Sequence, residues 1–354
     1  MTILFITENL GSGGAERQLT RLAAYCQHQG HKAIVVTWVN RNFHDGYLRE
    51  NNVEHILLPP KNKVDRVLKV ASLMRERKAD AAISYLPMSN ETAILARLLS
   101  PKTKLIVSER SFTTSWSRRR QLTNFLYRFA DHIVANSNNE AKNIIEHCPA
   151  LKSKTVAIPN SVELDVFQMK QEHKYHKPVR LVGVGRIIPS KNIVRLLEAI
   201  KKVIESGYDV QLNWYGAPLD KNYLKEIEGT TKRLGIAEKC LFHGECQNIQ
   251  QAYTDNDIFV MPSLLEGYPN VMVEAMACGL PVAASAVCEH PFIIKDGENG
   301  ALFNPHDTDA IADAIIHLLE LPQSRLEKIC RFNRNWVENN NSIRSLYDKY
   351  MELL

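Results

Sequence analysis

The sequence predicts an α/β protein made of two doubly wound domains, and three observations carry this prediction. Short apolar runs alternate with amphipathic helical patterns along nearly all of the 354 residues. The alternation starts afresh near residue 178, after a polar and charged stretch. A chain of this length also tends to divide into two cores of roughly 150–200 residues. Alternating strands and helices are typical of a parallel sheet with helices on both faces.

The first half supplies the elements of one domain. Residues 3–7 are expected to form its first strand, and residues 15–30 a helix. In that helix, apolar side chains recur at the spacing of one helical face, and Gly30 suits the helix end. The shared face consists of Leu19, Leu22, Ala23 and Cys26. Further strands are expected at 32–38, 80–86, 104–110 and 132–137. These elements predict a first domain over residues 1–166.

The second half repeats the pattern. The helix expected at 192–207 places Ile193, Leu196, Leu197, Ile200, Val203 and Ile204 on one face. Strands are expected at 178–186, 210–216, 240–244, 257–263 and 281–285. These elements predict a second domain over 178–339, a linker at 167–177 and a last helix at about 340–354. Each domain should bind ligands at the carboxyl ends of its strands, with the active site in the cleft between them.

Composition excludes several classes of protein. No apolar run approaches the roughly 18–20 residues of a spanning helix, and the N-terminus reads as a strand rather than a signal peptide. The seven cysteines form no C-x-x-C pair, and no His/Cys cluster has metal-ligand spacing. We therefore expect a cytoplasmic protein with reduced thiols and without a metal site.

The positive charge is concentrated in the first half of the chain. Residues 1–175 carry 25 Lys and Arg against 16 Asp and Glu, whereas the remainder carries 19 against 23. This excess indicates either an anionic partner or an ordinary solvated surface. Within residues 110–130, Arg118, Arg119, Arg120 and Trp116 suit a helix on the inner face of an anionic membrane. The alternative is a core-packed helix with a basic end. Nucleic-acid binding is disfavoured, because no recognition motif accompanies the scattered basic residues.

The first strand–helix turn holds a glycine-rich loop that resembles a dinucleotide-binding fingerprint without matching it. A G-x-G-x-x-G pattern from Gly11 would need a third glycine where Glu16 stands. An acid in the first helical turn would oppose a pyrophosphate there, which argues against NAD or FAD. Gly13 and Gly14 still allow a ligand to approach the backbone closely, although a simple flexible turn is the alternative.

The restart of the pattern carries two cations. Arg186 follows a predicted strand, and Lys191 precedes a predicted helix that Ser190 or Asn192 could cap. Two cations at the carboxyl edge of a parallel sheet suit a phosphate group. Ordinary surface charges are the alternative for this pair taken alone.

Two acids flank the start of another predicted helix. Glu266 lies eight residues before Glu274, and a Gly-Tyr-Pro-Asn turn separates them. The free N–H groups of a helix start suit a diphosphate. The flanking carboxylates suit sugar hydroxyls, with Glu274 on a ribose diol and Glu266 on the sugar being moved. The alternative is that both acids merely cap or solvate a loop.

Five segments together resemble the retaining glycosyltransferase family 4, the group 1 glycosyl transferases of GT-B fold. They are GSGGAER, IPNSVELDVF, GVGRIIPSKNIVRLLEAI, EGYPNVMVEAMACGLPVAAS and IKDGENGALFNPHD. The resemblance implies catalytic roles for Glu266, Arg186 and Lys191. It implies a donor site made of Gly13, Gly14, Arg186, Lys191, Glu266, Gly267, Tyr268, Pro269, Asn270, Val271 and Glu274. It also implies that the last helix packs back on the first domain.

The same resemblance implies transfer of a sugar, with retention, from a nucleoside diphosphate sugar, and a UDP-sugar fits best. No metal or other cofactor is expected. The acceptor would be a glycan or a polyprenyl-diphosphate-linked sugar in surface polysaccharide synthesis, which would place the protein at the inner membrane face.

The sequence departs from the family pattern at three places. Glu109 or Arg110 stands where many relatives have a His, and Ser161 follows Asn160 where Asn-Gly is usual. Phe292 stands where an acid is usual. Two alternatives stay open: a sugar-nucleotide 2-epimerase of the same fold, and a non-catalytic subunit that binds nucleotide sugars.

Overall fold

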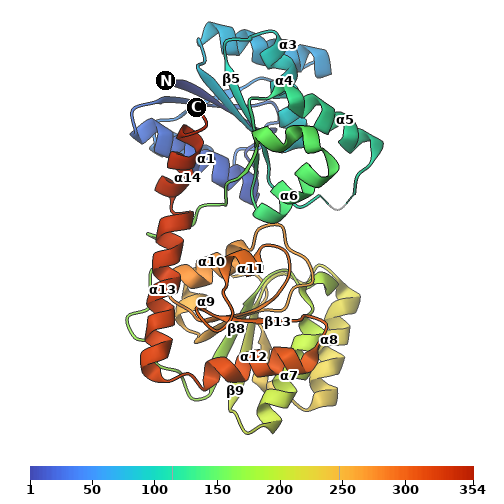
Figure 1. Cartoon of the computed structure of the whole chain (residues 1–354), viewed down its shortest axis with the longest axis vertical. Helices are drawn as coiled ribbons and strands as arrows, with labels where there is room; N and C mark the ends of the chain where they lie inside the picture. Colours follow the sequence, from blue (N-terminus) through green and yellow to red (C-terminus); the bar gives the residue numbers. More distant parts are fainter. Residues whose placement is uncertain (114, 247) are drawn as a thin grey trace. The chain divides into compact units, whose positions relative to one another are not determined.

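The protein consists of two compact α/β units, as the sequence predicts. The computed structural model describes residues 1–113, 115–246 and 248–354, and for Arg118 and Arg119 it describes the backbone only. Unit 1 comprises Met1–Ser161 and Ile343–Leu354, and unit 2 comprises Val162–Ser342. Each unit has its own parallel sheet with helices on both faces (Figure 1).

Unit 1 contains a seven-stranded parallel sheet in the order β3-β2-β1-β4-β5-β6-β7. Its strands are β1 (Thr2–Ile6), β2 (Lys32–Thr37), β3 (Glu54–Leu57), β4 (Ala81–Tyr85), β5 (Lys104–Glu109), β6 (His132–Ala135) and β7 (Thr155–Ala157). Its helices are α1 (Gly14–His28), α2 (Asp45–Glu50), α3 (Lys63–Glu76), α4 (Pro87–Leu98), α5 (Arg118–Leu126), η1 (Tyr127–Phe129), α6 (Asn138–His147), η2 (Pro149–Lys154) and α14 (Ile343–Met351). The strands expected in this half are all present; β3 and β7, both short, were not predicted.

Successive side chains of each strand in unit 1 point to opposite faces, and both faces are buried. Ile3 and Phe5 of β1 pack with α1 and α14. Leu4 and Ile6 pack on the other face with α3, α4 and α6. The C-terminal helix therefore lies beside α1 (Figure 1), where the Tyr350 hydroxyl donates to the Tyr85 hydroxyl at 3.1 Å.

Unit 2 contains a six-stranded parallel sheet in the order β10-β9-β8-β11-β12-β13. Its strands are β8 (Val179–Val184), β9 (Val210–Tyr215), β10 (Cys240–Phe242), β11 (Ile258–Met261), β12 (Val282–Ser285) and β13 (Ala301–Phe303). Its helices are η3 (Pro189–Lys191), α7 (Ile193–Glu205), α8 (Lys221–Leu234), η4 (Ala237–Lys239), α9 (Ile249–Thr254), α10 (Asn270–Ala277), α11 (His290–Ile293), α12 (Thr308–Leu319) and α13 (Gln323–Asn341). The sequence pattern missed the three-residue strand β13.

Helix α7 shows why this half folds as predicted. Its apolar stripe is buried against the sheet beside α8 and α12, and each large aliphatic side chain contributes roughly 1.5–3 kcal/mol. The other face of the sheet packs against α10 and α13. Residues 167–177 lie in unit 2, where Lys170 Nζ donates to the Asn256 carbonyl at 2.6 Å and His176 bonds the Asp257 carboxylate at 2.8 Å.

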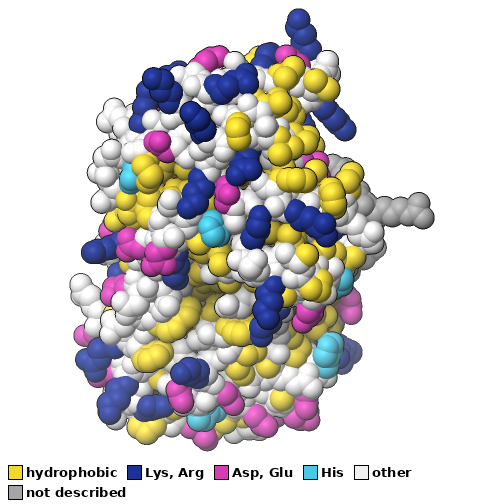
Figure 2. Space-filling view, turned by 45° about the horizontal axis from the view of Figure 1, so that its top comes forward, with side chains coloured by type: hydrophobic (Ala, Val, Ile, Leu, Met, Phe, Trp, Pro, Cys, Tyr) yellow, Lys and Arg dark blue, Asp and Glu magenta, His cyan; other side chains and the backbone are white. Residues whose placement is uncertain are grey.

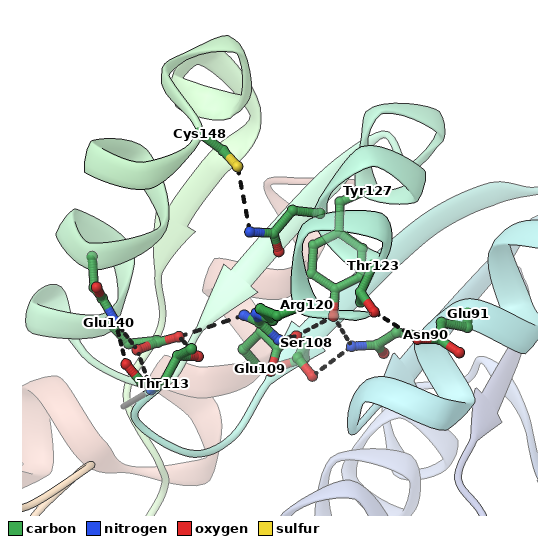
Figure 3. A network of polar contacts seen from close by, with 12 residues as sticks. Asn90, Glu91, Ser108, Glu109, Thr113, Arg120, Thr123, Tyr127, Glu140 and Cys148 are labelled. Atoms are coloured by element: carbon green, nitrogen blue, oxygen red, sulfur yellow. Dashed lines mark hydrogen bonds and ion pairs between the residues drawn. The ribbon is translucent and has the colours of Figure 1, made fainter. Parts of the chain in front are cut away.

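A buried ion-pair network organises the basic segment 110–130. Arg120 Nη1 donates to Glu109 Oε1 at 2.8 Å, and its Nη2 lies 3.7 Å from Glu140 Oε1. The Tyr127 hydroxyl also donates to Glu109. Figure 3 shows these side chains pointing toward one another from β5, α5, η1 and α6. Burial raises the pKa of the Glu109 carboxyl.

This network corrects part of the expected membrane-binding face. The Arg120 side chain is only 11% exposed, because it neutralises two buried acids. Trp116 is half-buried and stacks on His147, with ring centroids 3.8 Å apart. The side chains of Arg118 and Arg119 lie outside the described residues. Arg120 is therefore not a surface cation available to lipid.

Arg120→Ala should destabilise unit 1 by about 3 kcal/mol, because it leaves two buried carboxylates without their cation. The loss should shrink as the pH falls, since the raised pKa of Glu109 means that the folded state takes up a proton before the unfolded state does. Hydrogen exchange of the β5 amides across a urea series measures the free energy of unfolding of unit 1. Arg128→Ala removes an exposed cation and should cost less than about 1 kcal/mol. Equal losses in the two variants would contradict the assignment.

Candidate functional site

The strand order of unit 2 reverses between β8 and β11. Doubly wound sheets bind ligands outside the carboxyl ends of the two strands at such a point. β8 ends at Val184 and leads into Arg186, whereas β11 ends at Met261 and leads into the loop 262–269. The cations and the acid Glu266 singled out in the sequence therefore belong to the same edge of one sheet.

An ion pair joins these two loops. Lys191 Nζ donates to Glu266 Oε1 at 2.5 Å, and each side chain is 14% exposed. The Ser190 carbonyl also accepts from the Leu264 N–H at 2.8 Å. An ammonium has three N–H donors. Lys191 can therefore hold Glu266 and still donate to an anion.

Two glycines let the chain pass close to itself beneath Lys191. A Cβ on Gly185 would lie 3.0 Å from the Lys191 Cε, and one on Gly216 would lie 2.0 Å from the Gly185 oxygen. Both residues have φ near +150°, a conformation that L side chains rarely adopt. Trp214 Nε1 donates to the Gly185 carbonyl at 2.9 Å and fixes this turn.

Arg186 borders a cavity of about 400 Å³ at the carboxyl ends of β8 and β9. Its side chain is exposed, and no hydrogen bond or ion pair to another described residue holds the guanidinium. The Tyr215 ring, on the cavity wall, stacks on His243 with centroids 4.5 Å apart. The cavity thus combines a free cation with an aromatic wall.

Asn192 acts differently from the helix cap that the sequence suggests. It is the residue before α7, but its φ of 55° is left-handed and its side chain makes no capping bond. Its Nδ2 donates instead to the Pro262 carbonyl at 3.2 Å and the Pro305 carbonyl at 2.8 Å. The capping prediction was wrong, because the amide ties three loops of this sheet edge together.

Helix α10 begins beside these loops. Pro269 precedes its first residue, and no side chain caps the helix start. Glu274 lies in its second turn and is 7% exposed, and its Oε2 accepts from the buried Tyr253 hydroxyl at 3.1 Å. One oxygen of this carboxylate is thereby oriented by the protein.

Residues 267–271 form the end of the loop after β11 and the beginning of α10. The Tyr268 side chain is buried, and its hydroxyl accepts from Asn341 Nδ2 at 2.5 Å. Burial raises its pKa. The tyrosine therefore anchors the loop to α13, and Gly267, Pro269, Asn270 and Val271 complete the turn into α10.

Sequence reasoning missed a group of polar side chains behind Glu266. The Glu266 N–H donates to Cys288 Sγ at 3.4 Å. His290 Nδ1 bonds the Ser285 carbonyl at 2.7 Å, and burial lowers the pKa of this histidine. The buried His290 Nε2 and Ser263 Oγ have no hydrogen-bond partner among the described residues. Of this segment, only Phe292 stood out in the sequence; it is exposed, whereas the nearby Glu289 is buried.

Gly13 and Gly14 belong to unit 1, where α1 starts after β1. The Glu16 carboxylate folds back over Gly13, so that a Cβ there would lie 2.2 Å from its Oε2. Gly14 has open space around it. Arg110 follows β5 at the same edge of the unit 1 sheet.

No three His, Cys, Asp or Glu side chains within the described residues are grouped as a metal ion requires. The seven cysteines are free thiols. In the described part of the chain, no helix is both long and apolar enough to cross a bilayer.

Solved structures with the same fold extend over almost the whole chain. The Anabaena protein HepE in complex with UDP superposes with a TM-score of 0.85 and 19% identity, covering 99% of each chain. A glycosyltransferase from Rickettsia africae superposes equally well, at 20% identity. At this identity the likeness establishes the GT-B fold alone.

Sequence relatives and family models agree with this fold. A D-inositol 3-phosphate glycosyltransferase of Geodermatophilus obscurus is 32% identical over 52% of this chain and 45% of its own length. A capsular polysaccharide biosynthesis glycosyltransferase of Staphylococcus aureus is 28% identical over 62% of this chain and 60% of its own. The match thus spans less than two thirds of either relative. The model of glycosyltransferase family 4 matches residues 12–166, and that of the glycosyl transferases group 1 matches residues 166–339. The chain therefore belongs to the family 4, group 1 glycosyltransferases.

Proposed function

We propose that this protein transfers a sugar, with retention, from a UDP-sugar to a sugar or lipid-linked sugar acceptor. Family membership supports sugar transfer as the reaction class. HepE has been solved with UDP and with UDP-glucose, which supports a uridine nucleotide as the donor. The S. aureus relative acts in capsular polysaccharide biosynthesis, which supports a role in surface glycan assembly.

The observation that carries this proposal is the ion pair between Lys191 and Glu266 at the reversal point of the unit 2 sheet, with Arg186 on the same sheet edge. A diphosphate needs cations and N–H donors, and the start of α10, which no side chain caps, follows the loop that holds Glu266. The cavity beside Arg186 offers a nucleobase an aromatic wall. The Glu274 carboxylate, which Tyr253 orients, suits the hydroxyls of a ribose diol.

The chemistry follows from where negative charge develops. Breaking the bond from the anomeric carbon to the diphosphate leaves charge on the phosphate oxygens. Arg186, Lys191 and the start of α10 stabilise that charge more in the transition state than in the ground state. Glu266 binds the transferred sugar and keeps Lys191 in position. No step in this scheme requires a metal ion.

Retention is best explained by attack on the same face that the diphosphate leaves. The departing phosphate oxygen then accepts the proton of the acceptor hydroxyl. Covalent attack by Glu266 is less well supported, because its Oε1 is bound to Lys191 and is correspondingly less nucleophilic. The 2-epimerase alternative predicts a changed sugar in the absence of acceptor, which the assay below also detects.

We further propose that the protein attaches peripherally to an anionic membrane. The contact surface would be the exposed side chains of α4 and α5, without the buried Arg120. Leu122, Phe125 and Phe129 are 61%, 50% and 40% exposed, and Arg128 lies over the Phe125 ring. Neighbouring α4 exposes Leu95, Leu98 and Leu99. Figure 2 shows hydrophobic side chains gathered beside Lys and Arg on unit 1. Such a surface suits a lipid headgroup layer.

Replacing Leu122 and Phe125 together by Asp should abolish sedimentation with phosphatidylglycerol vesicles. Leu219→Asp, which places an acidic side chain at an exposed leucine of unit 2, should leave sedimentation unchanged. If the wild-type protein does not sediment with anionic vesicles, the proposed membrane attachment is contradicted, whereas the transferase proposal is unaffected.

The function is tested by following nucleotide release from a panel of UDP-, GDP- and ADP-sugars, with sugar products identified by NMR. One UDP-sugar should react with retention, and Arg186→Ala or Lys191→Ala should slow it by about 10²–10³-fold, as for loss of one charge-stabilising group. Lys202→Ala, on the exposed face of α7, is the matched control. Unchanged rates in both site variants would refute these assignments.

A further inference from the structure

A guanidinium lies among neutral groups at the carboxyl edge of the unit 1 sheet. Arg110 Nη1 donates to Ser108 Oγ at 3.2 Å, and Nη2 donates to Asn160 Oδ1. Its Cζ lies 4.5 Å from the centre of the Tyr85 ring. These contacts orient the side chain without neutralising it.

Arg110 differs in this respect from three other arginines of unit 1. Arg77, Arg97 and Arg120 each pair with a carboxylate. Among the described residues no carboxylate lies within ion-pair distance of Arg110, and its buried Nε has no hydrogen-bond partner. A guanidinium stays charged in proteins, and a buried unpaired donor is costly. The side chain is therefore suited to an anionic ligand.

The nearby acids do not take this role. Glu109 precedes Arg110, but its carboxylate is bound by Arg120 and Tyr127 (Figure 3). Glu140 accepts from the Thr113 N–H and hydroxyl at 2.9 and 2.6 Å and lies near Arg120. Both acids thus serve the network around Arg120, and the positive charge of Arg110 remains uncompensated.

Arg110 lies at the edge of the sheet where a ligand is expected to bind. The strand order of unit 1 reverses between β1 and β4, and β5 is the next strand after β4. Arg110 follows β5 and lies over Tyr85, the last residue of β4. Ligands of doubly wound domains bind at this edge. Tyr85 is itself held by Tyr350, so the guanidinium rests on a rigid support.

We propose that Arg110 forms an anion subsite in unit 1 that binds a phosphate group of the acceptor. This proposal rests on the function proposed above and specifies its acceptor as phosphate-bearing. The planar fork of a guanidinium matches phosphate oxygens. The donor diphosphate already has Arg186 and Lys191 in unit 2, which leaves Arg110 in unit 1 to the second substrate.

Calorimetric titration of the full chain with farnesyl diphosphate, farnesol and UDP tests the subsite. Arg110→Ala should weaken farnesyl diphosphate about tenfold or more and leave farnesol and UDP within twofold. Lys191→Ala should do the reverse and weaken UDP only. Arg110→Lys keeps the charge but loses the fork, and should weaken farnesyl diphosphate less than Ala does. Arg49→Ala, which removes an exposed cation from α2, controls for the loss of one positive charge in unit 1.

Three results would overturn the subsite. In the first, Arg110→Ala leaves farnesyl diphosphate unchanged. In the second, Arg110→Ala weakens UDP binding as much as farnesyl diphosphate binding, which would show that Arg110 binds the donor diphosphate. In the third, farnesol is weakened equally, which would show a loss of packing rather than of an anion contact. Failure of UDP to bind the wild type would instead count against the proposed function. It would leave the subsite standing, because farnesyl diphosphate is titrated without UDP.

Discussion

The ion pair between Lys191 and Glu266 is the contact on which the candidate site depends. It joins the loop after β8 to the loop after β11. It also holds a cation and an acid, both largely buried, at the edge of the sheet. Neither charge would be stable there alone, since burial of an unpaired ion is costly. A ligand that brings phosphates and hydroxyls can share the pair, because the ammonium keeps spare donors and the carboxylate keeps spare acceptors.

Both units use the same structural principle with different charges. In each, the carboxyl ends of parallel strands converge where the strand order reverses, and the loops there carry the polar side chains. Unit 2 places two cations beside the start of α10. Unit 1 places Arg110 on a tyrosine and commits Glu109 to Arg120. The two edges therefore suit two different anionic groups, as the proposed transfer from a charged donor to a charged acceptor requires.

The sequence predicted those features that rest on periodic burial or on loop position after a strand. The main strands, the apolar stripe of α7, and the sheet edge shared by Arg186, Lys191 and Glu266 follow from such patterns. The strands β3, β7 and β13 have three or four residues each, too few to show a period. Contacts between segments far apart in the sequence could not be predicted from these patterns either. The burial of Arg120 depends on acids from β5 and α6, and the tether of Asn192 depends on loops 70 and 113 residues away.

The most direct test of the central claim is calorimetric titration of UDP into the wild type, Lys191→Ala and Glu266→Gln. If Lys191 is shared between Glu266 and the diphosphate, Lys191→Ala should weaken UDP about tenfold or more. Glu266→Gln should bind UDP at least as tightly as the wild type, because it removes a competing negative charge while keeping the shape of the side chain. Loss of UDP binding in Glu266→Gln, or undiminished binding in Lys191→Ala, would contradict the account.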